Sequence, residues 1–131
     1  MGKLNIVGVG PGSKEYLTQN AIETVENSDI TIGSQRALDL FENKKEYIVF
    51  NVKDLTKKLE ESVEMAKEGK NITILSTGDP GFSGVLKPIK RISNEKGFNI
   101  DNINVIPGIS SLQLAASKNH INWDEANIIT F

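Results

Sequence analysis

The chain has 131 residues, which suits a single domain able to bury on the order of two thirds of its unfolded surface. Its 15 Lys and Arg against 17 Asp and Glu give a net charge of −2, and the basic residues are dispersed, which argues against a nucleic-acid-binding surface. No cysteine is present, which excludes disulfides, thiolate metal sites and a cysteine nucleophile.

The first half of the sequence alternates short apolar runs with segments of helical periodicity. Residues 4–7 are expected to form a strand, and Thr18 to cap a helix that buries Ala21, Ile22 and Val25. A second strand is expected over residues 29–33, followed by a short helix over residues 35–41 that begins after Ser34. A third strand over residues 47–50 leads to the clearest helical pattern of the chain, which starts near Asp54 and ends at Gly69.

The second half continues the alternation. Strands are expected over residues 72–75, 103–106 and 128–131, and helices over residues 85–92 and 109–116. Pro88 restricts the helix over residues 85–92 to a start nearby, and Gly97 is its predicted end. This order predicts an α/β domain with a mostly parallel sheet flanked by helices. No apolar run approaches about 20 residues and no signal-peptide pattern opens the chain, so we expect a cytoplasmic protein with no membrane span.

Three of the predicted strands run directly into glycine- and proline-rich segments. These segments are residues 8–12 (GVGPG), 76–84 (STGDPGFSG) and 107–111 (PGISS). Because ligands of open α/β sheets bind at the carboxyl ends of the strands, and glycine exposes backbone groups to a ligand, we expect the three segments to line one pocket. The alternative is three ordinary turns, which need Gly and Pro for backbone reasons alone.

Several familiar chemistries do not fit these segments. A dinucleotide-binding pattern would place its third glycine at Ser13, Pro11 has no N–H for a pyrophosphate, and no P-loop occurs. The single histidine, His120, lies at the predicted close of a helix, so neither a catalytic triad nor a metal site is expected. Asp79 is as compatible with a base or a metal ligand as with an acid that accepts hydrogen bonds from backbone N–H groups of its own turn. A pocket of backbone groups suits a reaction in which a cofactor carries the activation, and methyl transfer from S-adenosylmethionine is one.

The three segments, in this order and spacing, resemble the tetrapyrrole methylase family. With the additional stretch Trp123-Asp124-Glu125-Ala126, they are most similar to the branch of the family that methylates cobalt-precorrin-7 at C5 in cobalamin synthesis. The resemblance runs along the whole chain. It implies S-adenosylmethionine as methyl donor, a tetrapyrrole as substrate and a homodimer. The dispersed charges and the lack of a long apolar run predict neither a nucleic acid nor a membrane as partner.

The resemblance also implies site residues. The positions that match the cofactor contacts of the family are Pro11, Thr77, Gly78, Asp79, Phe82, Ser110 and Ser111. Arg36 would meet a carboxylate of the tetrapyrrole, whereas its alternative reading is a solvated arginine on a helix face. Uroporphyrinogen methylases of the family place an aspartate after the second strand, where this chain has Gly33 and Ser34, so no catalytic acid or base is assigned.

The family has a second α/β domain, and the cofactor would lie in the cleft between the two. Residues 1–131 are therefore expected to be the N-terminal domain, without the second domain and inactive alone. Two other methylase types of the same architecture are the enzyme alternatives: diphthine synthase and the ribosomal RNA ribose methylases. The non-enzyme alternative is a binding or interaction module.

Overall fold

A computed structural model describes residues 2–76 and 85–108 of the chain. Five parallel strands form one sheet in the order β3-β2-β4-β1-β5, so β4 lies between two strands that precede it in sequence. The strands are β1 (Leu4–Gly8), β2 (Ile30–Gly33), β3 (Glu46–Val49), β4 (Ile72–Ser76) and β5 (Ile103–Ile106). The predicted α/β fold with a parallel sheet is confirmed. The expected segments 109–116 and 128–131 lie outside the described residues.

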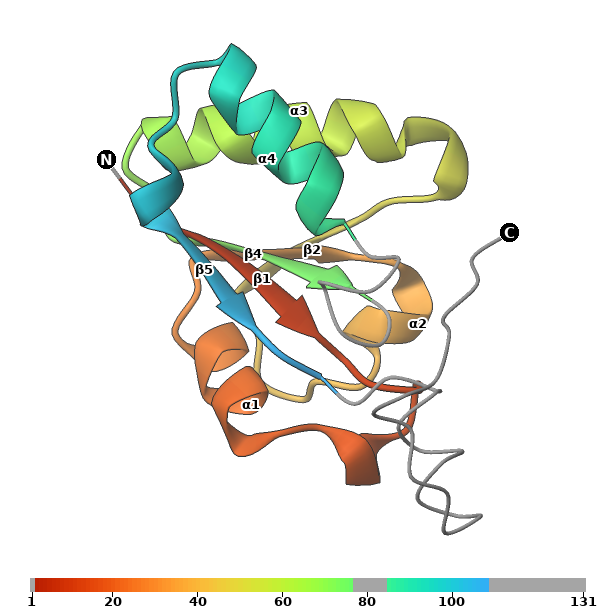
Figure 1. The fold of residues 1–131 in the computed structure, drawn as a ribbon. Coiled ribbons are helices and arrows are strands. Elements are labelled where there is room, and N and C mark those ends of the chain that lie inside the picture. The colour runs from red at the N-terminus through yellow and green to blue at the C-terminus, as the bar shows by residue number, and fades with distance from the viewer. Residues whose placement is uncertain (1, 77–84, 109–131) are drawn as a thin grey trace, which may run out of the picture.

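Helices cover both faces of the sheet (Figure 1). The pair α1 and α2 packs on one face, and the pair α3 and α4 on the other. The α-helices are α1 (Gln19–Glu26), α2 (Gln35–Leu38), α3 (Leu55–Lys67) and α4 (Leu86–Glu95), and the short 3-10 helices are η1 (Lys14–Tyr16), η2 (Val52–Asp54) and η3 (Ile100–Asn102).

Local sequence signals explain most helix boundaries. The side-chain oxygens of Thr18 and Ser34 accept hydrogen bonds from backbone N–H groups at the starts of α1 and α2, as predicted. Gly97 follows α4 with a φ of 71° and Gly69 follows α3 with a φ of 106°, which is the left-handed region that favours glycine.

The helix expected over residues 35–41 is shorter than predicted. It ends at Leu38, after which the N–H groups of Leu40 and Phe41 donate to carbonyls only three residues back. Phe41 is buried all the same, because these tight turns keep its side chain against the sheet. The apolar spacing therefore predicted burial correctly and helix length incorrectly.

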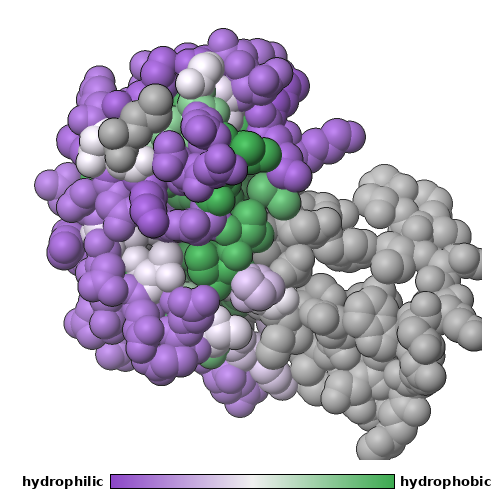
Figure 2. Space-filling view, turned by 60° about the vertical axis from the view of Figure 1, so that its left-hand side comes forward, coloured by the Kyte–Doolittle hydropathy of each residue, from purple (hydrophilic) through white to green (hydrophobic). Residues whose placement is uncertain are grey.

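Alternation along the strands divides the core into two clusters. Ile6, Ile32 and Ile74 face α3 and α4, whereas Val7 and Leu75 face α1 and α2. The inner strands β1, β2 and β4 are buried throughout, which explains why they read as continuous apolar runs. The edge strand β5 leaves Val105 43% exposed, and Figure 2 shows an apolar band on the side of the molecule where β5 lies.

A polar layer lies under α1, toward the amino ends of the strands. The side-chain amide of Asn5 donates to Thr73 Oγ1 at 3.3 Å and to Asn71 Oδ1 at 3.0 Å, and its oxygen accepts from Asn104 at 3.0 Å. Because these residues sit on β1, β4 and β5 or directly before β4, Asn5 holds the registers of three neighbouring strands together.

Thr31 and Thr73 face each other across β2 and β4 and provide a matched pair of substitutions. Thr73 Oγ1 is hydrogen-bonded to Ser28 and Asn5, whereas the buried Thr31 Oγ1 has no hydrogen-bond partner in the described part of the chain. Thr73→Val should lower the free energy of unfolding by about 2 kcal/mol, and Thr31→Val should raise it by roughly 1 kcal/mol, because it removes an unpaired buried hydroxyl. Urea unfolding followed by circular dichroism measures both, and equal losses would contradict the assignment of the two hydroxyls.

Candidate functional site

The structure brings the starts of the three glycine- and proline-rich segments together. β4, β1 and β5 are adjacent and parallel, and their registers pair Gly8 with Ser76 and Val7 with Ile106. The strand ends that precede the three segments therefore lie side by side at the carboxyl edge of the sheet. The sequence alone predicted that the three segments lie at one edge of the sheet. The strand order shows that the strands before them, β4, β1 and β5, are neighbours.

The first segment is fixed by one backbone contact and two left-handed glycines. The N–H of Val9 donates to the carbonyl of Ser76 at 2.8 Å, which ties the end of β1 to the end of β4. Gly10 and Gly12 have φ values of 74° and 100°, a conformation that other residues adopt at a cost. Pro11, one of the predicted cofactor contacts, lies between them, half-buried and at the predicted edge.

Ser76 closes the second segment at both ends. Its carbonyl accepts from Val9, and its Oγ accepts from the N–H of Val85 at 3.4 Å. The end of β4 and the residue before α4 are thus held together at Ser76. Sequence reasoning treated Ser76 only as part of the loop pattern, and its position as the last residue of an apolar strand is the signal for this role.

Most predicted cofactor contacts belong to the parts of the chain that the structure does not describe. Thr77, Gly78, Asp79, Phe82, Ser110 and Ser111 lie outside the described residues, as do His120 and the stretch 123–126. For these positions the structure gives the strand ends to which their segments are attached. Their roles stay predictions.

Arg36 lies beside the first segment, although it belongs to the helix that follows β2. It sits in α2, which follows β2, and a Cβ placed on Gly12 would lie 3.5 Å from its Nη2 atom. The guanidinium therefore lies against Gly12, next to Pro11. Arg36 is exposed, and its side chain makes no hydrogen bond or ion pair within the described residues, so its charge is available to a ligand.

The end of β2 offers no free acid or base. Gly33 is buried against Leu75 of β4, and the hydroxyl of Ser34 accepts from the N–H of Ala37 at 3.2 Å as the cap of α2. Gly33 is thus constrained by packing, and the Ser34 hydroxyl serves as a helix cap.

A separate cavity is lined in part by Lys14, two residues after Gly12. It has a volume of about 290 Å³ and lies between η1, α1 and the turn after α2, with Leu17, Ile22, Phe41 and Glu42 in its wall. None of the predicted site residues lines it. Within residues 2–76 and 85–108 there is no group of three His, Cys, Asp or Glu side chains that could hold a metal ion, and no helix long and apolar enough to cross a membrane.

Comparison with known proteins decides the family. The model of the Tetrapyrrole (Corrin/Porphyrin) Methylases matches residues 3–131. The chain belongs to the tetrapyrrole methylase family. Its membership confirms the resemblance carried by the three segments.

This tetrapyrrole methylase is similar to several relatives and solved structures. It is 46% identical over 126 residues to a probable cobalt-precorrin-7 C(5)-methyltransferase of Methanocaldococcus jannaschii, a match that covers 95% of this chain and 58% of the relative. The precorrin-6Y methylase of Archaeoglobus fulgidus superposes with a TM-score of 0.73 at 26% identity, over 95% of this chain and 62% of that one. The uroporphyrin-III C-methyltransferase of Thermus thermophilus, crystallised with S-adenosylhomocysteine, has a TM-score of 0.65 at 24% identity, over 88% and 52% of the two chains. The chain thus spans somewhat over half the length of these relatives.

Proposed function

We propose that this chain belongs to an S-adenosylmethionine-dependent methyltransferase that methylates cobalt-precorrin-7 at C5 in cobalamin biosynthesis. The single observation that carries the proposal is the adjacency of the carboxyl ends of β4, β1 and β5, from which the three family segments start. The identity to the cobalt-precorrin-7 methyltransferase supports this substrate over others of the family. S-adenosylmethionine suits such a site because its sulfonium already activates the methyl group. The protein then needs mainly to orient the methyl group and exclude water.

The proposed donor site is built on Pro11, Thr77, Gly78, Asp79, Phe82, Ser110 and Ser111. When S-adenosylmethionine is bound, it supplies the electrophilic methyl group. The left-handed Gly10 and Gly12 shape the backbone on either side of Pro11, and the guanidinium of Arg36 stands beside them to hold a carboxylate of the tetrapyrrole. The general base stays unassigned.

The wider organisation is part of the same proposal. We place the donor in a cleft between residues 1–131 and a second α/β domain, in a cytoplasmic homodimer. The share of the relatives that the chain spans supports the second domain, and the lack of cysteine suits the cytoplasm. Dimerisation rests on the family resemblance.

Calorimetry on the intact protein tests the donor. S-adenosylmethionine should bind and NADH should not. Residues 1–131 alone should bind the donor about tenfold more weakly or worse, because a ligand in a half-built cleft stays in contact with water. Binding of NADH by the intact protein, without S-adenosylmethionine binding, would overturn the proposed function, and tight binding by residues 1–131 would refute the shared cleft.

A further inference from the structure

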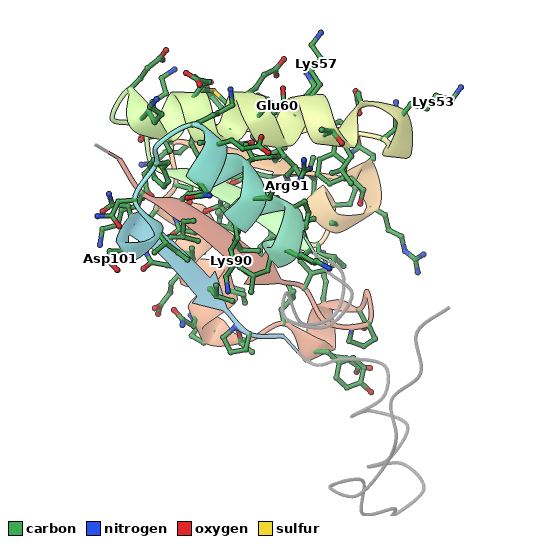
Figure 3. All side chains as sticks on the ribbon, turned by 45° about the horizontal axis from the view of Figure 1, so that its top comes forward. Lys53, Lys57, Glu60, Lys90, Arg91 and Asp101 are labelled. Atoms are coloured by element: carbon green, nitrogen blue, oxygen red, sulfur yellow. The ribbon has the colours of Figure 1, made fainter. Side chains whose placement is uncertain are left out.

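Three exposed cations follow three neighbouring strands of the sheet. Lys53 lies in η2 after β3, Arg36 lies in α2 after β2, and Lys87 lies in the first turn of α4, the helix that follows β4. Because β3, β2 and β4 are adjacent and parallel, all three residues belong to the carboxyl edge. We call Arg36, Lys53 and Lys87 the cation rim. Figure 3 shows Lys53 at the end of the molecule opposite Asp101, which precedes β5 and so marks the amino edge.

The backbone beneath each cation is anchored to the sheet edge. The N–H of Phe50 donates to the carbonyl of Gly33 at 3.0 Å, and Asn51 and Asp54 form a reciprocal cap around Lys53. Val85, two residues before Lys87, is bound to Ser76 Oγ, and Arg36 rests against Gly12. The backbone positions of the three residues along the edge are therefore set by the fold.

The charges of the cation rim are not neutralised by partners. The ion pairs within the described residues engage Lys14, Lys58, Arg91 and Lys96, and none engages the rim.

Acids near this edge have other contacts. Asp54 accepts from the N–H of Asn51 at 2.8 Å, Asp39 accepts from Gln35 at 2.8 Å, and Glu42 pairs with Lys14. Among the described residues this leaves Glu15 of η1 as an exposed acid after β1, and Asp79, which follows β4, lies outside them. In addition, the first turns of α1, α3 and α4 carry no acidic residue, although acids are favoured at the positive ends of helices. Within residues 2–76 and 85–108, three cations along one edge are thus without an ion-pair partner.

The cation rim is wider than a single carboxylate and borders the predicted donor segments. Adjacent strands lie about 4.8 Å apart, so β3 and β4 are separated by roughly 10 Å. The strand β4 belongs both to the rim and to the set β4, β1 and β5 that carries the donor segments. A ligand that meets all three cations must therefore carry several anionic groups on a broad frame, next to the predicted donor segments.

We propose that the cation rim is a specificity-determining site that binds the peripheral carboxylates of a polycarboxylate macrocycle, with Lys53 and Lys87 acting beside Arg36. This inference rests on the proposed function, since it concerns the substrate side of the same edge. A hydrophobic contact with the macrocycle would not distinguish substrates by their number of carboxylates, whereas the rim does.

Fluorescence titration of the intact protein with uroporphyrin, which has eight carboxylates, tests the rim. Each of the variants Arg36→Gln, Lys53→Gln and Lys87→Gln should weaken binding by about two- to fivefold, the range expected for an exposed ion pair, and the triple variant by about tenfold or more. Lys70→Gln removes the same charge just before β4, at the amino edge, and should bind as the unchanged protein does. Mesoporphyrin, with two carboxylates, should lose less affinity in the triple variant than uroporphyrin loses.

The same proteins separate this inference from the proposed function. Calorimetry with S-adenosylmethionine should give one affinity for all of them. If the donor binds normally and the rim variants bind uroporphyrin as Lys70→Gln does, the cation rim is not a substrate site and the proposed function stands. If the donor fails to bind while uroporphyrin binding still depends on the rim, the proposed function fails and the rim stands. Loss of binding to a polynucleotide in the triple variant, without any change toward uroporphyrin, would overturn the carboxylate assignment.

Discussion

A valine in place of Gly78 should reduce the affinity of the intact protein for S-adenosylmethionine by about 100-fold, which corresponds to about 2.7 kcal/mol of binding free energy. The glycine belongs to the segment between Ser76 and Val85, both of which are held at the end of β4. In a site built from backbone groups, a branched side chain at a glycine enters the space of the ligand and restricts the turn. Calorimetry with S-adenosylmethionine measures the loss.

Asp79→Ala is the matched control in the same segment, and it should cost less than about tenfold, because it removes one side chain and leaves the turn open. Circular dichroism of both variants separates lost binding from lost folding. A harmful Asp79→Ala beside a harmless Gly78→Val would show that a side chain, and not the backbone, carries the donor site.

Gly33→Val should destabilise the fold by about 3 kcal/mol, the upper end of the range for overpacked cores. Gly33 is the last residue of β2, and a Cβ there would lie 3.0 Å from both Cβ and Cδ1 of Leu75 on β4. Since Leu75 is buried, it has little room to move. Urea unfolding measures the loss, and the same variant should weaken binding at the edge, because β2 and β4 carry Arg36 and the segment after Ser76.

A double-mutant cycle locates the cause of this destabilisation. Gly33→Ala and Leu75→Ala each lower the free energy of unfolding, but together they should cost about 1 kcal/mol less than the sum, since the smaller Leu75 side chain makes room for the new methyl group. Strictly additive losses would mean that the contact with Leu75 does not constrain β2.

The Thr31 and Thr73 pair illustrates where sequence reasoning ends. Both are threonines within short apolar strands, and both are buried. Only the packing of α1 brings Ser28 to Thr73 and leaves Thr31 without a partner within the described residues. A local pattern specifies which face of a strand is covered, but not which atom covers it.

The same limit applies to the candidate site. The glycine and proline segments are legible in the sequence because left-handed and proline-restricted backbone needs particular residues, as Gly10 and Gly12 illustrate. The contact between Arg36 and Gly12, and the unpaired state of Lys53 and Lys87, have no local signal, because each depends on elements far apart in the chain.

The sequence by itself determined the alternation of strands and helices, the caps at Thr18 and Ser34, the glycines that end α3 and α4, and the family. These depend on periodicity and on backbone preferences of residues close together in the chain. Tertiary structure alone decided that β4 lies between β2 and β1, which places the starts of the glycine- and proline-rich segments beside the strands that precede the cation rim. Strand order is set by side-chain packing and hydrogen bonds between residues such as Asn5 and Thr73, 68 positions apart, and no local preference encodes such a pairing.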